Sequence, residues 1–368
     1  MLYRRMPIEI EAPEGLGYDK IDCNLSESSF TDQRLSDLGI DINNLLLFYG
    51  DHKGKPELRE LIARESNVTA DDVLVTSGAA TALFIIATSL LNKGDHIIVA
   101  KPNYATNIET PRAIGADISF LQLAFDEKFE LDISALEKLL TPKTRLLSLT
   151  YPHNPTGVVL SREKLDAIIR LVEQNNCYLL LDETYRDMCF VEPLPIAATL
   201  SDRVISISSM SKSYGLPGIR IGWMICTNEP LLETFLAAKE QICITNSVID
   251  EAIAFQYLQR KEQLFAPVRD TIAKNFVVLK NFMANQQVLE WVEPKGGCIC
   301  FPRVKSHIPV DMNAFHDILL NTYATYVGRG HWFEEDARYM RIGYSWDSTE
   351  KLQKGLQNIL KAVEEARI

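Results

Sequence analysis

Short apolar runs alternate with amphipathic segments along most of the chain after about residue 56. The amphipathic segments at 56–66, 79–91 and 161–175 have helical periodicity, and the last begins at Ser161, a residue suited to capping a helix. The apolar runs lie between and beyond them, at 73–78, 96–100, 145–150, 177–182, 203–208 and 220–225. Such runs are typical of strands that are buried on both faces. The pattern therefore predicts an α/β fold in which helices cover a mostly parallel sheet.

The last third of the chain has a different pattern. A long helical stretch at 229–260 is followed by a helix at 266–285, short strands near 298–302 and 339–343, and a closing helix at 349–366. These elements predict a smaller α+β domain. We expect a large domain at 41–262 and a small domain formed by 1–40 and 263–368.

Composition narrows the class of partner. The chain has 368 residues, is 46% hydrophobic and carries a formal net charge of −11, so nucleic acid and anionic membrane surfaces are not expected partners. The longest apolar segment, 83–91, is far shorter than the roughly 20 residues that a membrane-spanning helix needs. The seven cysteines are odd in number and dispersed, which indicates reduced thiols and a cytoplasmic protein. Small molecules are the expected partners.

Polar motifs follow four of the predicted strands. They are TSGAA after the first run, YPHNPTG after 145–149, DETY after 179–181 and SSMSKSYG after 204–207. In open α/β sheets, ligands bind beyond the carboxyl ends of the strands. We therefore expect these motifs to form one site.

Lys212 is the central candidate residue of that site. A lysine among small polar residues at a strand end can be partly desolvated, which lowers its pKa and makes the amine nucleophilic. Ser209 and Arg220 lie close enough in sequence to bind one phosphate beside it. The alternative is an ordinary solvated loop lysine.

The segment S-x-x-K…G-x-R-x-G around Lys212 resembles the lysine signature of the class I/II aminotransferase family, which has PLP-transferase fold type I. The resemblance extends in consistent order from about Tyr49 to Arg341. It implies a mostly parallel seven-stranded sheet sandwiched by helices, with pyridoxal 5′-phosphate (PLP) bound to Lys212 as a Schiff base.

Three further residues correspond to ligands of the cofactor ring in that family. Asp182 would keep the pyridine nitrogen protonated, which makes the ring an electron sink. Tyr185 and Asn154 would both bind the phenolic oxygen. Without the resemblance, Asp182 could be a helix cap and Asn-Pro-Thr-Gly a simple turn.

The remaining cofactor contacts follow the same resemblance. Small residues at Ala79 and Ala80 would let the phosphate approach backbone N–H groups at a helix start. Tyr104 would stack on the pyridine, although it could instead be a core or surface tyrosine. Tyr49 resembles the tyrosine that reaches the phosphate of a partner subunit, which implies a homodimer.

Arg341, in the motif RIGYS, corresponds to the residue that holds the substrate α-carboxylate. A planar guanidinium binds a carboxylate with two parallel hydrogen bonds. A strand arginine in a surface ion pair is the alternative. With Asn154, Arg341 is our candidate for substrate binding.

The expected reaction is transfer of an amino group between an L-amino acid and a 2-oxo acid, with Lys212 as the general base. The YPHNPTG, SKSYGLPGIRIGW and GGCICFPR segments are also similar to the subgroup that includes capreomycidine synthase, which eliminates and cyclises. Carbon–sulfur lyases share the fold. A non-enzymatic binding domain is disfavoured because the lysine, aspartate and arginine are all present.

The sequence leaves the roles of several other polar residues open. Arg329 and His331 replace part of a family motif near the expected substrate mouth, and we consider them as candidates for side-chain selection or as plain loop residues. Glu27 falls where the family folds its start over the site, but no partner follows from sequence. Cys298 and Cys300 lack a nearby cluster of further Cys or His, so we expect no metal site.

Overall fold

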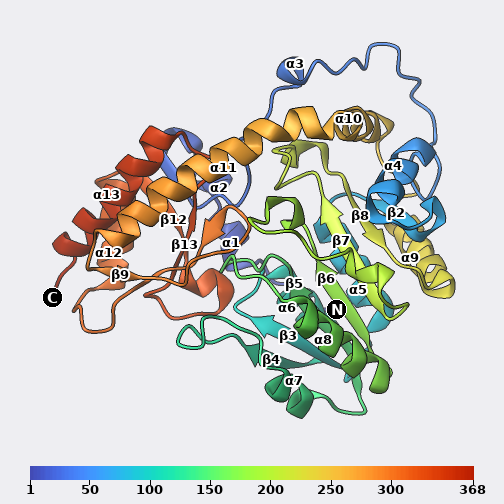
Figure 1. Cartoon of the computed structure of the whole chain (residues 1–368), viewed down its shortest axis with the longest axis horizontal. Coiled ribbons are helices and arrows are strands. Elements are labelled where there is room, and N and C mark those ends of the chain that lie inside the picture. The colour runs from blue at the N-terminus through green and yellow to red at the C-terminus, as the bar shows by residue number, and fades with distance from the viewer.

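A large sheet with helices on both faces lies beside a smaller unit formed by the two ends of the chain. The computed structural model describes residues 1–368. In Figure 1 the red and orange C-terminal helices lie on one side, and α11 (Lys261–Ala284) runs from them toward the large sheet. No helix is both long enough and apolar enough to span a bilayer.

The large sheet has seven strands, the number that was expected, and their order is β2-β8-β7-β6-β5-β3-β4. Only β8 runs antiparallel to its neighbours. The strands are β2 (Val73–Thr76), β3 (His96–Lys101), β4 (Asp117–Gln122), β5 (Thr144–Thr150), β6 (Tyr178–Asp182), β7 (Val204–Ser209) and β8 (Gly222–Ile225).

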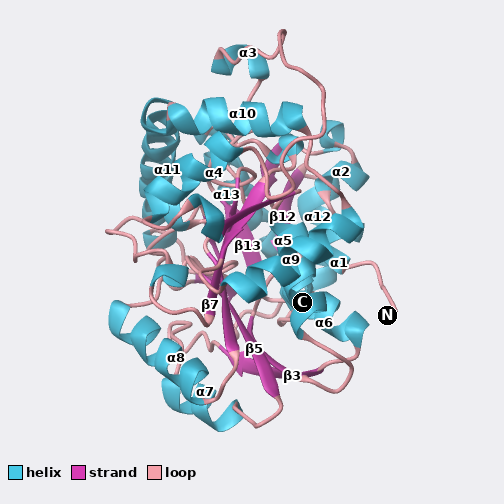
Figure 2. Cartoon of the chain, turned by 90° about the vertical axis from the view of Figure 1, so that its right-hand side faces the viewer, coloured by secondary structure: helices cyan, strands magenta, loops and turns pink.

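Side chains alternate between two buried faces along these strands. Leu147 and Leu179 pack into one apolar cluster, while Leu146 and Leu180 pack into another on the opposite face. Figure 2 shows helices on both sides of the strands. Burial of both faces explains the near-continuous apolar runs in the sequence.

The helices of this region divide between the two faces. One face is covered by α7 and α8 and the other by α5, α6 and α9, while α4 and α10 pack together beside β2. The bounds are α4 (Pro56–Ser66), α5 (Ala79–Leu90), α6 (Thr106–Ile114), α7 (Ile133–Leu139), α8 (Arg162–Gln174), α9 (Glu229–Ile242) and α10 (Val248–Gln259).

The smaller unit contains a four-stranded sheet in the order β1-β12-β13-β10. Cys23 of β1 pairs with Thr325 of β12, so the N-terminal segment joins the C-terminal sheet. The domain boundaries that we expect remain a prediction. The strands are β1 (Cys23–Leu25), β10 (Ile299–Cys300), β12 (Thr325–Arg329) and β13 (Met340–Gly343), with a separate pair β9 (Leu289–Glu290) and β11 (Arg303–Val304).

Helices also pack on this smaller sheet, and short helices occur in the N-terminal segment. The helices α12 (Met312–Asn321) and α13 (Thr349–Glu365) contact each other, and both contact β12. The short helices are α1 (Pro7–Ile10), α2 (Pro13–Leu16) and α3 (Leu35–Leu38). Single 3₁₀ turns occupy Tyr18–Lys20, Ala70–Asp72, Arg186–Met188, Ala197–Thr199, Pro217–Ile219 and Gly330–Phe333.

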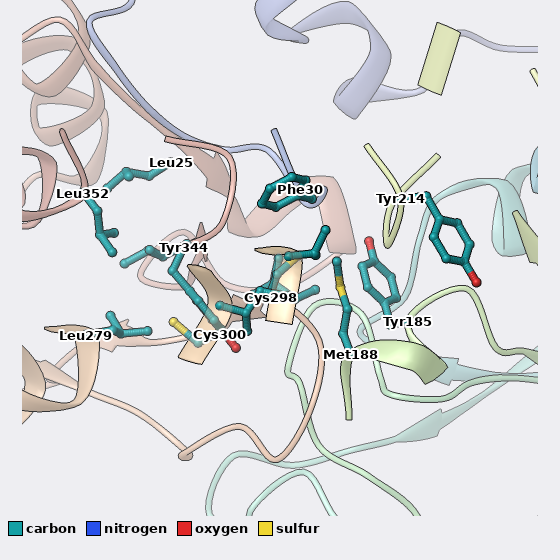
Figure 3. Close-up of a cluster of buried hydrophobic side chains, with 14 of the residues drawn as sticks. Leu25, Phe30, Tyr185, Met188, Tyr214, Leu279, Cys298, Cys300, Tyr344 and Leu352 are labelled. Atoms are coloured by element: carbon teal, nitrogen blue, oxygen red, sulfur yellow. The ribbon is translucent and has the colours of Figure 1, made fainter. Parts of the chain in front are cut away.

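The largest apolar cluster joins the two regions. Figure 3 shows Tyr185 and Met188, which follow β6, in the same cluster as Cys298 and Tyr344 from the C-terminal part. A shared core of this kind holds the C-terminal strands against the edge of the large sheet. All seven cysteines are free, and most are buried.

Two sequence predictions need correction. The stretch 229–260 is not one helix, because α9 ends at Ile242 and α10 begins at Val248, where the Ser247 side chain caps the new helix. The strand β4 was absent from the predicted runs. It lies at the sheet edge and is mostly half-buried or exposed, so its sequence lacks a continuous apolar run.

Candidate active site

The polar motifs that follow the strands meet at one edge of the large sheet. Gly222, the first residue of β8, pairs with both Thr76 at the end of β2 and Ser209 at the end of β7. Asp182 at the end of β6 pairs with Thr150 at the end of β5. Because β8 is antiparallel, its beginning lies at the edge where its parallel neighbours end.

A cavity of about 370 Å³ opens at this edge, within the usual range for small-molecule sites. Every residue that the sequence analysis assigned to the cofactor or to the substrate α-carboxylate lines it, with the exception of Tyr49. These lining residues are Ala79, Ala80, Tyr104, Asn154, Asp182, Tyr185, Ser209, Lys212, Arg220 and Arg341.

The start of α5 and Arg220 together form one corner of the cavity. Gly78 precedes the helix with a φ of +85°, and Arg220 has a left-handed φ of 47°. This conformation is uncommon for a residue with a side chain. Here the Arg220 guanidinium lies against Gly78 and donates to the Pro217 carbonyl at 2.7 Å. The free N–H groups of the helix start and the guanidinium together suit a phosphate.

Lys212 lies just beyond β7 and is half-buried in the cavity wall. Its backbone carbonyl accepts a hydrogen bond from the Phe30 N–H at 2.9 Å, which ties the loop to the N-terminal segment. Burial lowers the pKa of the Lys212 ammonium, and the negative charge of Glu27 opposes that shift. A lowered pKa favours the neutral, nucleophilic amine.

Asp182 Oδ1 accepts two hydrogen bonds within the chain, whereas Oδ2 accepts none. Its Oδ1 accepts from the Thr184 N–H at 3.0 Å and from the Thr184 hydroxyl at 2.6 Å. Burial raises the pKa of Asp182, while the two Thr184 hydrogen bonds and the charge of Lys212 oppose the rise. A cationic ring N–H in the cavity would stabilise the ionised form.

Tyr185 and Asn154 bring polar groups to the cavity from the loops after β6 and β5. The Tyr185 hydroxyl is buried and has no hydrogen-bond partner within the chain. Burial raises its pKa, which keeps the hydroxyl protonated as a donor. Such a buried, unpaired hydroxyl is costly unless a ligand supplies an acceptor.

Arg341 reaches the same cavity from β13 in the smaller unit. Its Nη2 donates to the Ser26 carbonyl at 2.7 Å, and its Nη1 donates to Asn154 Oδ1 at 3.3 Å. The guanidinium lies 5.1 Å from the centre of the Phe333 ring, and its buried Nε has no partner. The guanidinium is therefore oriented and retains hydrogen-bonding capacity.

Tyr104 and Tyr49 occupy different environments. Tyr104 lines the cavity, and its hydroxyl donates to Glu9 Oε1 at 3.3 Å. Tyr49 is 79% exposed and lies outside the cavity. Its expected contact with the phosphate of a partner subunit stays a prediction.

The sequence analysis missed most of the N-terminal wall. Ile8, Glu9 and Glu14 all line the cavity, as does Trp332 from the last 3₁₀ turn. Residues of α1 and α2 have no strand-end motif that would mark them. Glu27 lies in the wall too, so the expectation that this segment folds over the site holds geometrically.

Arg329 and His331 do not line the cavity. Both face Glu11, with Arg329 Nε at 3.8 Å and His331 Nε2 at 3.0 Å from its carboxylate oxygens. The Trp332 indole N–H donates to the same carboxylate at 2.7 Å. The selectivity role considered for these two residues therefore has no geometric support, because both side chains are directed to Glu11.

The cavity fits PLP by the chemistry of its donors. The corner at Gly78 and Arg220 suits a phosphate, and Lys212 is an amine that can bond an aldehyde. The unpaired Tyr185 hydroxyl suits a phenolic oxygen, while the available oxygen of Asp182 suits a ring nitrogen. One end of the cavity, at Arg341, remains for a carboxylate.

Comparisons with known proteins agree with this arrangement. The sequence model described as "Aminotransferase class I and II" matches residues 25–359. Capreomycidine synthase from Streptomyces vinaceus is 29% identical over 324 residues, which cover 87% of this chain and 82% of that protein. Aspartate aminotransferase from Thermotoga maritima is 30% identical over 268 residues, covering 70% of this chain and 69% of that one.

A solved structure gives the same result for the fold. The crystal structure of a PLP-dependent aminotransferase from Streptococcus suis has a TM-score of 0.91, with 25% identity and full coverage of both chains. The family match spans both the large sheet and the smaller unit. The chain therefore belongs to the class I and II aminotransferase family, the fold type I enzymes that use pyridoxal 5′-phosphate.

Proposed function

We propose that the protein transfers an amino group between an L-amino acid and a 2-oxo acid. The observation that supports this most is the convergence of Lys212, Asp182 and Arg341 on one cavity from separate parts of the fold. When bound there, PLP supplies an electron sink for the negative charge that develops at the substrate α-carbon.

The proposed roles of the residues follow from their positions. The N–H groups of Ala79 and Ala80, with Ser209 and Arg220, would hold the phosphate. Asp182 would accept the ring N–H, and Tyr185 and Asn154 would bind the phenolic oxygen. Tyr104 would cover one face of the ring. All these residues line the cavity.

Arg341 would bind the substrate α-carboxylate and thereby orient the α-hydrogen. Lys212, once released from the cofactor, would take that proton on Nζ. Its lowered pKa supports a neutral amine before the transfer. A flexible amine can then return the proton to a different carbon, which is what amino-group transfer requires.

Elimination with cyclisation is the second candidate. It is favoured by the similarity to capreomycidine synthase over most of the chain. Cleavage of a carbon–sulfur bond is a more distant alternative on the same fold. All three outcomes can begin with proton removal by Lys212, so the cofactor-binding residues do not discriminate among them.

Two broader expectations belong to the same proposal. We infer a homodimer in which Tyr49 reaches the cofactor of its partner, since Tyr49 is exposed and does not line the cavity of its own chain. We also infer a cytoplasmic location, which is supported by free, mostly buried cysteines.

Single-turnover experiments distinguish amino-group transfer from elimination. Under the proposal, holoenzyme and an amino acid release one equivalent of 2-oxo acid, and turnover continues only after a second 2-oxo acid is added. Continued turnover without that acceptor, with loss of a side-chain group, would identify elimination instead. Chromatography of the products and cofactor absorbance provide the readouts.

A lysine variant tests the site itself. In Lys212→Ala, we expect no covalent attachment of PLP after borohydride reduction and no turnover. Lys280→Ala is the matched control, because Lys280 is exposed and pairs with Glu293 far from the cavity residues. Borohydride-stable labelling of Lys212→Ala, with activity retained, would refute the assignment.

A further inference from the structure

The residues that line the cavity include more carboxylates than the proposed roles use. Asp182, Lys212, Arg220 and Arg341 all have roles toward the cofactor or the substrate backbone. The remaining charged lining residues are Glu9, Glu14 and Glu27. All three are carboxylates, and none of them forms a salt bridge with a cation of the cavity.

Glu27 is the innermost of the three. It is half-buried, and its one hydrogen bond comes from the neutral Tyr18 hydroxyl at 3.4 Å. It directly follows Ser26, whose carbonyl accepts from Arg341 Nη2. Glu27 therefore directly follows the residue whose carbonyl orients the Arg341 guanidinium. It lines the cavity near the end where the substrate would lie.

The other two carboxylates lie on the short N-terminal helices that cover the mouth. Glu9 is in α1 and accepts from the Tyr104 hydroxyl, and Glu14 is in α2 beside the buried Pro13. Neither forms an ion pair within the chain. Arg329 and His331 lie against Glu11 and so do not neutralise this wall.

The pKa of Glu27 reflects its burial and the charges around it. Burial raises its pKa, and Glu14 raises it further, whereas Lys212 and Arg341 lower it. A partly desolvated carboxylate without a direct cationic partner is unfavourable. A positively charged group that enters the cavity would compensate it, whereas a second carboxylate would be repelled.

We propose that the amino-acid substrate carries a cationic side chain, guanidinium or ammonium, which Glu27 binds while Glu9 and Glu14 make the mouth favourable for its entry. This inference rests on the proposed function, since it requires the α-carboxylate to bind at Arg341. It selects against substrates with an acidic side chain, because the cavity has no further cation to receive a second carboxylate.

Unreactive ligands test the proposal independently of the reaction. Calorimetry on the holoenzyme would compare δ-guanidinovalerate with hexanoate and adipate, which have similar length but a neutral or acidic end. We expect δ-guanidinovalerate to bind about 10- to 100-fold more tightly than hexanoate, the range for a hydrogen bond to a charged group, and adipate to bind most weakly. Adipate as the tightest ligand would overturn the proposal.

Two variants test whether Glu27 is the carboxylate that binds the cationic side chain. Glu27→Gln keeps an acceptor for Tyr18 but removes the charge, so we expect the preference for δ-guanidinovalerate over hexanoate to fall to about 2-fold or less. Asp19→Asn is the matched control, because Asp19 is an exposed carboxylate of the same segment outside the cavity. An unchanged preference in Glu27→Gln would show that Glu27 does not select the side chain.

These affinities test the substrate class independently of the proposed reaction. These ligands lack an α-amino group, so their affinities do not depend on whether the enzyme transaminates or eliminates. A panel of arginine, ornithine and lysine, with neutral citrulline as comparison, then distinguishes guanidinium from ammonium. Cation selectivity without transfer to a 2-oxo acid would contradict the proposed reaction but support the substrate class.

Discussion

The Arg220 guanidinium lies directly against Gly78, so a side chain at Gly78 would displace it. A Cβ atom at Gly78 would lie 2.5 Å from Arg220 Nη2, closer than non-bonded atoms approach in proteins. The φ of +85° at Gly78 also suits a residue without a side chain. Because Gly78 has no Cβ, the Arg220 guanidinium can lie beside the free N–H groups at the start of α5.

We expect Gly78→Ala to weaken PLP binding by about 10- to 100-fold, because displacement of Arg220 removes a charge-assisted phosphate contact. Backbone strain should also lower the free energy of unfolding by about 1–3 kcal/mol. Equilibrium dialysis with PLP and urea denaturation would measure these effects. Gly218→Ala is the control, since a Cβ there has open space. Equal PLP affinities of the two variants would argue against this phosphate site.

Arg341→Lys should selectively impair recognition of the carboxylate. Lysine keeps the charge but loses the planar fork that already contacts Ser26 and Asn154, so amino-acid affinity should fall by about 10- to 100-fold. Binding of the corresponding amines, which lack the carboxylate, should change little. Titration of both ligand types against the holoenzyme tests this. Equal losses of affinity for the amino acids and the amines would indicate a general defect in the cavity. Arg367→Lys is the control, because Arg367 forms an exposed ion pair with Glu364.

The exposed run Leu46, Leu47, Phe48 and Tyr49 has the character of a subunit contact, with Tyr49 at 79% exposure. We expect a dimer by analytical ultracentrifugation. Lys212→Ala and Tyr49→Ala subunits should each have little activity alone. Mixed dimers should regain activity, because one of their two sites receives an intact lysine and an intact tyrosine. A lack of recovery despite subunit exchange would place Tyr49 outside the partner's site.

Glu183 should make stability depend on pH. Burial raises its pKa to about 7, although Oε1 accepts from the Ala197 N–H and the Ser206 hydroxyl, and Oε2 has no partner. An unfolded glutamate releases its proton near pH 4.3, so the folded state binds more protons between that pH and about 7. The Glu183 contribution to stability therefore falls by a few kcal/mol as pH rises through this window, because a tenfold difference in proton affinity corresponds to about 1.4 kcal/mol.

Glu183→Gln removes this proton while it keeps an acceptor for both hydrogen bonds. Relative to wild type, the variant should gain free energy of unfolding as pH rises from about 5 to about 8. Urea denaturation at several pH values would measure the difference. Glu293→Gln, at an exposed carboxylate, should follow the wild-type curve. Parallel curves for Glu183→Gln and wild type would contradict the raised pKa.

Local sequence was sufficient for much of the sheet and for most of the polar residues that line the cavity. Strands such as β6 are buried on both faces and so have continuous apolar sequences, and the segment predicted at 56–66 matches α4. The motifs around Asn154, Asp182 and Lys212 follow strand ends, so sheet topology alone brings them together. The edge strand β4 was not identified because partial exposure weakens its apolar pattern.

The amino-acid sequence by itself determined where most of the strands end and which polar groups follow them. Only the tertiary structure determined that Glu9, Glu14 and Glu27 form an acidic wall, and that Glu11 binds Arg329 and His331 away from the cavity. The physical reason is the range of the interactions. Hydrogen bonding and burial within a strand are local, whereas the electrostatic balance of the cavity depends on segments that meet only after the N-terminal strand β1 pairs with β12.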